Sequence, residues 1–149
     1  MKRYYGGIVK DLTRMGVAAM ILRRVSIAAE SSDSAEYFEL VDQGLMELND
    51  GTEVELVEAW FLLNLARVMG EEVNLYRDVE GSKLVSEGRY TWDSMEGALV
   101  MDERGEYGAN EIKMLRLMLT SSLNVVKRVK TDTELTARML SVARAVSKM

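Results

Sequence analysis

The stretch of sequence that decides the fold is WFLLNLARVMG at residues 60–70. Upstream of it, Thr52 is followed three positions later by Glu55, which is the form of a capping box at the start of a helix. Gly70 is a typical residue at the point where a helix stops. The spacing therefore predicts a helix over about 53–69, with the apolar stretch in its second half.

One face of this predicted helix carries Phe61, Leu65 and Met69 at steps of four. Such a face most often packs into a core, and it can also line a groove that admits the apolar end of a partner's tail. Trp60 lies next to this face and is expected at the surface, and Arg67 is a candidate cation for a tail carboxylate. The candidate partner-binding residues are therefore Trp60, Phe61, Leu65 and Arg67.

Two further helices are predicted before this one. The first spans about Ile8 to Ala28, and the second starts at a capping box of Asp33 and Glu36 and runs to about Leu48. Apolar residues at steps of three and four mark the faces expected to be buried: Ile8, Leu12, Met15, Ala19, Leu22 and Val25 in the first helix, and Phe38, Val41, Leu45 and Leu48 in the second.

The helical period stops after Gly70. Short runs of β-branched and aromatic residues between turns predict a small β-hairpin in the region 73–102. A helical period returns after it and continues to the end of the chain. The elements expected from here on are strands at 84–85, 89–92 and 97–100, and helices at about 110–119, 122–128 and from Thr133 onward.

Composition favours the mainly α class. The chain has 149 residues, and we expect residues 1–149 to form a single helical domain of five to six helices with a small β-hairpin insert. It contains no Pro, whereas average usage would give about seven, so few helices are interrupted. It contains no Cys or His, which excludes disulfides, imidazole bases and Cys/His zinc sites, and no cofactor is expected.

Charge is distributed unevenly along the chain, whose net charge is −5. Residues 1–30 carry a net +4 and residues 113–149 a net +6, whereas residues 31–75 carry −10 and residues 76–112 carry −5. The chain can present one basic face if its two ends meet in space. No uncharged run approaches the ~20 residues that a membrane span needs, so we expect no membrane partner and a cytoplasmic location.

The order of these elements and several local strings resemble the helical C-terminal region of the bacterial recombination mediator RecO. The glycine-terminated helix at residues 60–70, which runs into an extended segment, looks like that family's Phe-Glu-Leu helix. The string YTWDSMEGA at residues 90–98 resembles its Phe-Ser-x-x-x-Gly-Gly hairpin. The strings IVKDLTR at 8–14, YFELV at 37–41 and GLMEL at 44–48 resemble the start of the same region.

This resemblance implies a non-catalytic role in recombinational DNA repair. Proteins of the family bind single-stranded DNA, partner RecR, recognise the acidic C-terminal tail of the single-stranded-DNA-binding protein, and promote strand annealing or recombinase loading. By the resemblance, this chain is expected to bind that tail, RecR or single-stranded DNA.

Three features depart from the family's pattern. The N-terminal OB-fold is absent, so the chain looks like a separated C-terminal region or a reduced relative. Where many members carry a four-Cys zinc site, residues 76–80 are YRDVE, and the hairpin is expected to hold together by packing alone. The basic residues that the family often places just before the helix Phe are Ala59 and Trp60 here, which counts against tail recognition by that pocket.

The basic C-terminal segment offers a second candidate site. Its candidate nucleic-acid-binding residues are Lys127, Arg128, Lys130 and Arg138, because cations that pair with phosphates release condensed counterions. The same charges also suit a solvated helix face near helix C-termini. Few aromatic residues lie beside them to stack on bases, so contact with single-stranded DNA should be weak and salt-sensitive.

Two other functions fit the same residues. A helical adaptor or dimerisation domain unrelated to DNA would show an exposed apolar patch and no response to oligonucleotides. A magnesium-dependent, all-α nucleotide pyrophosphatase would use the pairs Glu36/Glu39 and Glu55/Glu58, which place carboxylates at i and i+3 on successive helices. Glu36 and Glu55 also occupy capping-box positions, which accounts for both without a metal.

Overall fold

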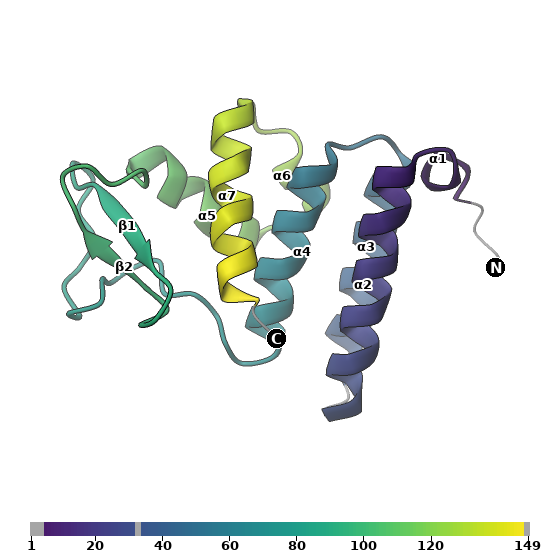
Figure 1. Cartoon of the computed structure of the whole chain (residues 1–149), viewed down its shortest axis with the longest axis horizontal. Helices are drawn as coiled ribbons and strands as arrows, with labels where there is room; N and C mark the ends of the chain where they lie inside the picture. Colours follow the sequence, from purple (N-terminus) through teal and green to yellow (C-terminus); the bar gives the residue numbers. More distant parts are fainter. Residues whose placement is uncertain (1–4, 32–33, 148–149) are drawn as a thin grey trace.

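A computed structural model describes residues 5–31 and 34–147 of the chain, and it is mainly α, as the sequence predicts. In these residues the chain forms seven helices and one two-stranded antiparallel sheet (Figure 1). The elements are α1 (Gly6–Val9), α2 (Leu12–Ser31), α3 (Ala35–Asn49), α4 (Val54–Val68), β1 (Tyr90–Asp93), β2 (Ala98–Met101), α5 (Ala109–Thr120), α6 (Leu123–Val126) and α7 (Thr133–Val146).

Helix α4 is the centre of the fold. It packs against α7 and α5 on one side and against α3 and α2 on the other, as Figure 1 shows. An unbroken run from Ala59 to Ala66 is buried, because helices cover α4 on most of its circumference. The stretch WFLLNLARVMG therefore does organise the fold, and Gly70, with a φ of +85°, ends its helix as predicted.

The observed helix boundaries differ from the predicted ones for local reasons. The first predicted helix is split because the Asp11 carboxylate accepts hydrogen bonds from the backbone N–H groups of Thr13 and Arg14 and starts α2 anew. Ser34 caps α3 by accepting from the N–H of Glu36, while the predicted cap Asp33 lies outside the described residues. The capping box predicted at Thr52 is wrong.

The Thr52 hydroxyl instead donates to Glu47 over 2.7 Å, and the N-cap of α4 is Glu53, whose side chain makes no capping bond. This hydrogen bond joins the end of α3 to the turn that follows it. The helix predicted from about residue 110 starts slightly earlier: the N-cap of α5 is Gly108, whose N–H donates to the Glu111 carboxylate over 2.8 Å.

Most of the buried face predicted for the first helix is wrong, although Ile8 is buried and Val25 packs against the core. Leu12, Met15 and Leu22 are 85%, 42% and 51% exposed, whereas the side that packs inward includes Val17 and Ile21. The burial predicted for α3 also fails at Phe38, which is 76% exposed, although Leu48 is buried and Val41 and Leu45 are partly buried against the core. Helix α2 carries apolar residues on two faces, and α3 and α4 cover only one of them.

The hairpin forms near its predicted place. β1 pairs with β2 in the register Tyr90 to Met101, while the third predicted strand at 84–85 is absent. Packing alone does not hold it, contrary to expectation. The N–H of Val79 donates to the carbonyl of Leu99 over 2.8 Å, and Tyr90 and Tyr107 exchange two backbone hydrogen bonds of 2.9 and 3.0 Å. The sheet is thereby joined on both sides to the chain around it.

Candidate partner-binding sites

The predicted pocket on α4 lies inside the core. Trp60, Phe61 and Leu65 are 2%, 0% and 2% exposed, so the expectation that Trp60 sits at the surface is wrong. Its indole N–H donates to the carbonyl of Ser121 over 3.1 Å, which shows that the segment after α5 covers it. These three side chains stabilise the fold and are not accessible to a partner in this conformation.

Arg67, the fourth predicted residue of that pocket, is partly exposed but engaged. Its guanidinium lies 3.0 Å from the Glu36 carboxylate and donates from Nε to the amide oxygen of Asn64 over 3.2 Å. Asn64 is itself buried and donates to the carbonyls of Trp60 and Met118, each over 2.9 Å. Arg67 therefore belongs to a polar network that ties α4 to α3 and α5.

The four predicted phosphate-binding cations divide into two pairs. Lys127 lies 2.9 Å from the buried carboxylate of Glu47, and Arg138 lies 3.2 Å from that of Glu111. These two cations are therefore paired with carboxylates of the protein itself, although both remain partly accessible to solvent.

Arg128 and Lys130 are exposed, and neither forms an ion pair with another of the described residues. They lie in the connection between α6 and α7, so the structure leaves two of the four predicted cations available to a partner.

The two basic ends of the chain meet at one point. The guanidinium of Arg24 in α2 donates to the carbonyl of Ser147 just after α7. Arg128 and Lys130 precede the opposite end of α7, as Figure 1 shows from the positions of α6 and the C-terminus. The contact therefore brings the ends together without joining all their cations into one basic face.

A groove beside Lys130 combines apolar and basic groups. It lies between α5 and the start of α7 and has a volume of about 450 Å³. Met114 is buried at its floor, Leu117 and Leu135 are partly buried, and Lys113 and Lys130 are exposed at its rim. The residues that line it are Asn110, Lys113, Met114, Leu117, Val129, Lys130, Asp132 and Leu135.

One carboxylate also lines this groove. Asp132 is the N-cap of α7, and its side chain accepts a hydrogen bond of 2.7 Å from the N–H of Leu135. Its negative charge is therefore partly balanced by the helix terminus. Of the groove residues, sequence reasoning found only Lys130, although Asn110, Lys113 and Leu117 follow one another at steps of three and four on α5.

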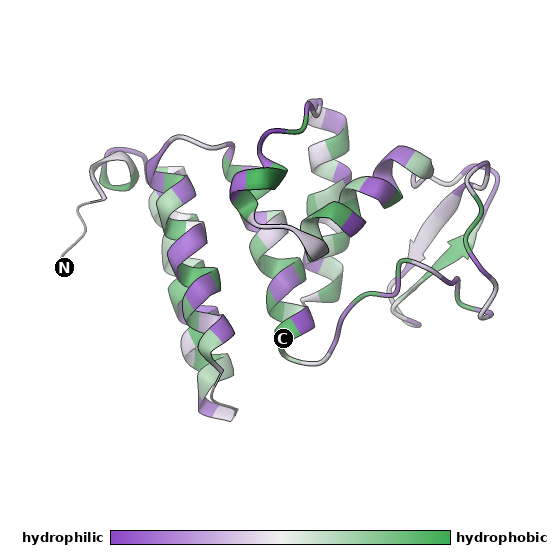
Figure 2. Ribbon diagram, turned by 180° about the vertical axis from the view of Figure 1, so that it is seen from behind, coloured by the Kyte–Doolittle hydropathy of each residue, from purple (hydrophilic) through white to green (hydrophobic). Residues whose placement is uncertain are grey.

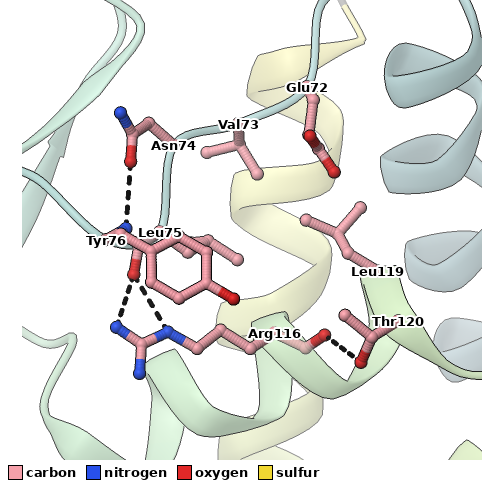
Figure 3. Close-up of a pocket in the computed structure, with 8 residues that line it drawn as sticks. All are labelled: Glu72, Val73, Asn74, Leu75, Tyr76, Arg116, Leu119 and Thr120. Atoms are coloured by element: carbon pink, nitrogen blue, oxygen red, sulfur yellow. Dashed lines mark hydrogen bonds between the residues drawn. The ribbon is translucent and has the colours of Figure 1, made fainter.

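A second hollow, of about 250 Å³, lies between α5 and the extended segment after α4 (Figure 3). Arg116 donates from Nε and Nη2 to the carbonyl of Leu75, over 3.0 and 2.6 Å, and stacks 4.5 Å from the centre of the Tyr76 ring. The amide oxygen of Asn74 accepts from the N–H of Tyr76 over 2.9 Å. Because these groups satisfy one another, the hollow is a structural joint that fixes this segment to α5.

The chain does not fit the zinc site that its resemblance implies. Residues 76–80 hold no thiol or imidazole, and Arg116 and the turn at Asn74 position the chain there instead. In residues 5–31 and 34–147, no group of three or more acidic side chains is placed to hold a metal ion.

The carboxylates of the pyrophosphatase hypothesis have other contacts. Glu36 pairs with Arg67 at 3.0 Å, and Glu58 accepts two hydrogen bonds from Arg144, of 2.8 and 3.2 Å. The hydrogen bond to Glu58 raises the pKa of Arg144 further above its ordinary value. These ion pairs join α3 to α4 and α4 to α7, and they occupy carboxylates that a magnesium ion would need.

The fold is mainly helical with a small hairpin. A family model described as "Recombination protein O C terminal" matches residues 9–146, so the chain belongs to this family, and to the proteins of recombination and repair. No curated protein and no solved structure matches the chain significantly. In the part of the chain that the structure describes, no helix combines the length and hydropathy needed to cross a membrane.

Proposed function

We propose that this chain is a non-catalytic mediator module of recombinational DNA repair that binds the acidic tail of a single-stranded-DNA-binding protein in the groove between α5 and α7. The observation that carries the proposal is the groove itself, which places the unpaired cations Lys113 and Lys130 around an apolar floor. Family membership supplies the biological setting.

The groove suits an acidic peptide with an apolar end. Met114 and Leu117 offer a surface on which an apolar side chain can be desolvated. Lys113 and Lys130 can then pair with carboxylates that remain at the rim, where such pairs contribute more to orientation and association rate than to affinity. Because the cations are exposed, binding should weaken as salt is added.

Single-stranded DNA is a weaker expectation for the same end of the molecule. Arg128 and Lys130 are available to phosphates, whereas Lys127 and Arg138 are held by Glu47 and Glu111. Two phosphate contacts on a single strand correspond to a slope of about −1.4 in log K against log salt concentration. RecR stays a predicted partner for which we single out no surface.

Fluorescence anisotropy with the whole chain tests the proposal. The probes are a labelled C-terminal tail peptide of a bacterial single-stranded-DNA-binding protein, the same peptide with scrambled sequence, and a labelled oligonucleotide. We expect the native tail to bind at least tenfold more tightly than the scramble. Lys130→Glu and Leu117→Asp should each weaken binding about tenfold or more, since one reverses a rim charge and the other places a charge in the apolar floor.

Lys83→Glu is the matched control, because Lys83 is exposed near the hairpin and does not line the groove. If Lys130→Glu and Lys83→Glu bind the tail with equal affinity, the groove is not the binding site. If the native and scrambled tails bind equally well, the tail is not a specific ligand of this chain. If neither the peptides nor the oligonucleotide binds, the adaptor function unrelated to DNA becomes the better hypothesis.

A further inference from the structure

The outer face of α2 is apolar and largely uncovered, although α1 packs against the α2–α3 pair at one end. Leu12, Met15 and Leu22 are exposed along it, and exposed small residues continue the same row at steps of three and four. The complete row is Leu12, Met15, Ala19, Leu22, Ser26 and Ala29, and none of its members is charged. A row of this length on a helix normally faces another element.

Helix α3 extends this apolar surface. Phe38 and Met46 are 76% and 39% exposed, and Leu45 is partly buried between them in sequence. The two helices run antiparallel, as Figure 1 shows. They pack closely at Gly44: a Cβ added at this position would lie only 3.0 Å from the Cδ1 of Ile21.

The apolar rows of both helices belong to the same side of the pair. Arg24 contacts the end of α7, which shows that its side of α2 faces α7. The side-chain oxygen of Gln43 accepts a hydrogen bond from the N–H of Leu123, which shows that its side of α3 faces α6. On the helical wheel, the exposed rows lie beyond the α2–α3 contact and face away from α4. This is the right-hand side of the molecule in Figure 1, and Figure 2 shows hydrophobic segments along the pair from the opposite view.

Opposite charges flank this surface. Arg23 lies along the edge on the α2 side, and Glu39 lies along the edge on the α3 side. Both are exposed, and neither forms an ion pair with another of the described residues. The middle of the face is mostly apolar, whereas Asp42, four residues from both Phe38 and Met46, joins Glu39 along the α3 edge, which is acidic. The α2 edge is mixed, because exposed Glu30 lies two turns from Arg23 on the same side of the helix.

We propose that this face binds a second copy of the same chain, so that the two α2–α3 pairs form a four-helix bundle. A two-fold axis parallel to the helices would place α2 of one copy against α3 of the other. Since Ile21 lies level with Gly44, residue 26 lies level with residue 39. Arg23 then comes within about 4.5 Å, along the helix axis, of the partner's Glu39.

The side-chain sizes match this arrangement as well. Phe38 projects from α3 at about the level of Ser26 and Ala29 on α2, so the ring of one copy meets small residues of the other. The alternative two-fold axis, perpendicular to the helices, would instead put the acidic edge of α3, with Glu39 and Asp42, against the same edge of the other copy and is disfavoured by repulsion.

The available area is sufficient for a modest dimer. The 15 residues of α3 span about 22 Å, and two adjacent helices are about 20 Å wide, so the face covers roughly 440 Å² in projection. Counted on both copies this is about 880 Å², which is the size of a weak and reversible contact rather than of a standard interface.

Sedimentation equilibrium of the whole chain across a range of concentrations tests the proposal. We expect a reversible rise toward twice the 16.8 kDa mass of one chain. Phe38→Glu and Leu22→Glu should each weaken association tenfold or more, with unchanged circular dichroism, because both side chains are exposed in the single copy. Met95→Glu is the matched control, since Met95 is 97% exposed in the hairpin turn. A chain that stays monomeric throughout, or a Phe38→Glu variant that associates normally, overturns the proposal.

Charge reversal and cross-linking test the geometry. Arg23→Glu and Glu39→Arg should each weaken association, and the double variant should restore it, because the swap exchanges the two edges of a symmetric interface. The chain has no Cys, so a mixture of Arg23→Cys and Glu39→Cys chains can be joined by a short bis-maleimide at chosen sites only. The mixture should cross-link and Arg23→Cys alone should not. Cross-linking of Arg23→Cys alone, or no rescue in the double variant, contradicts the parallel axis.

Discussion

Helices α4 and α2 carry similar apolar patterns and have opposite surroundings. α4 is buried over the whole run Ala59–Ala66, because four other helices pack around it. α2 is covered on one side only and leaves the row that includes Leu12 and Leu22 exposed. Apolar periodicity therefore identifies a face that needs a contact. It does not say whether that contact lies within the chain or with another molecule.

The largest contrast is expected between the two phenylalanines of the chain. Phe61→Ala in α4 should lower the free energy of unfolding by about 3–5 kcal/mol, because a completely buried ring leaves a cavity. Urea unfolding followed by circular dichroism measures the change at unaltered m-value. A loss below about 1 kcal/mol would mean that α4 is not the rigid centre of the fold.

A smaller loss is expected in the polar part of the centre. Asn64→Ala removes two buried donors to the carbonyls of Trp60 and Met118 and the acceptor for Arg67. Leaving such groups unpaired should cost about 1–3 kcal/mol in the same unfolding measurement. Asn124→Ala in α6 is the control, because Asn124 is exposed. If the two variants unfold alike, the network contributes nothing to the centre.

The stability contributed by the contact between Tyr107, which follows the hairpin, and α7 should decrease at alkaline pH. Burial raises the pKa of the Tyr107 hydroxyl, which donates to the carbonyl of Arg138 over 3.2 Å. The folded state disfavours the phenolate, so this contribution to stability is complete below about pH 10 and is lost as the pH rises through the folded-state pKa. Tyr107→Phe should cost about 0.5–1.5 kcal/mol at neutral pH through the lost hydrogen bond.

The stability difference between the original chain and Tyr107→Phe should therefore shrink above about pH 10, because only the original chain titrates at this position. Unfolding free energies of both chains at neutral and alkaline pH measure it. A difference that is constant across that range would show that the hydroxyl titrates alike in the folded and unfolded states.

The smallest effect on folding is expected on the outer face of α2 and α3. In dilute solution, Phe38→Ser should change the free energy of unfolding by less than about 0.5 kcal/mol, because the ring is 76% exposed. At high concentration the original chain should gain stability from association and the variant should not. Thermal unfolding of both chains over a range of concentrations checks this, and equal concentration dependence would count against the dimer.

Local signals in the sequence predicted most of the secondary structure. Gly70 ends its helix as expected, and the last helix starts at Thr133, because these ends depend on backbone conformation and nearby side chains. Thr52 shows the limit of such signals. Its side chain was predicted to cap the next helix. In the fold, the Glu47 carboxylate lies close to Thr52, and the hydroxyl forms a hydrogen bond with that carboxylate instead.

The candidate sites were less predictable than the elements. Lys127 and Lys130 look equivalent in sequence, yet only Lys127 has a buried carboxylate beside it, supplied by Glu47 from a distant helix. Lys113 becomes a rim residue because the start of α7 folds across from it. Pairings between residues far apart in sequence decide which charges remain available, and one sequence does not contain them.

The sequence by itself determined the mainly α class, the hairpin and the family resemblance, because these follow from residue types and their spacing over short distances. It also excluded thiol and imidazole chemistry through the absence of Cys and His. Only the tertiary structure decided that Trp60 is buried, that Phe38 and Leu22 are exposed, and that Lys130 remains unpaired beside a groove. The physical reason is that burial and charge neutralisation depend on which elements pack together, and that choice is made by the whole chain.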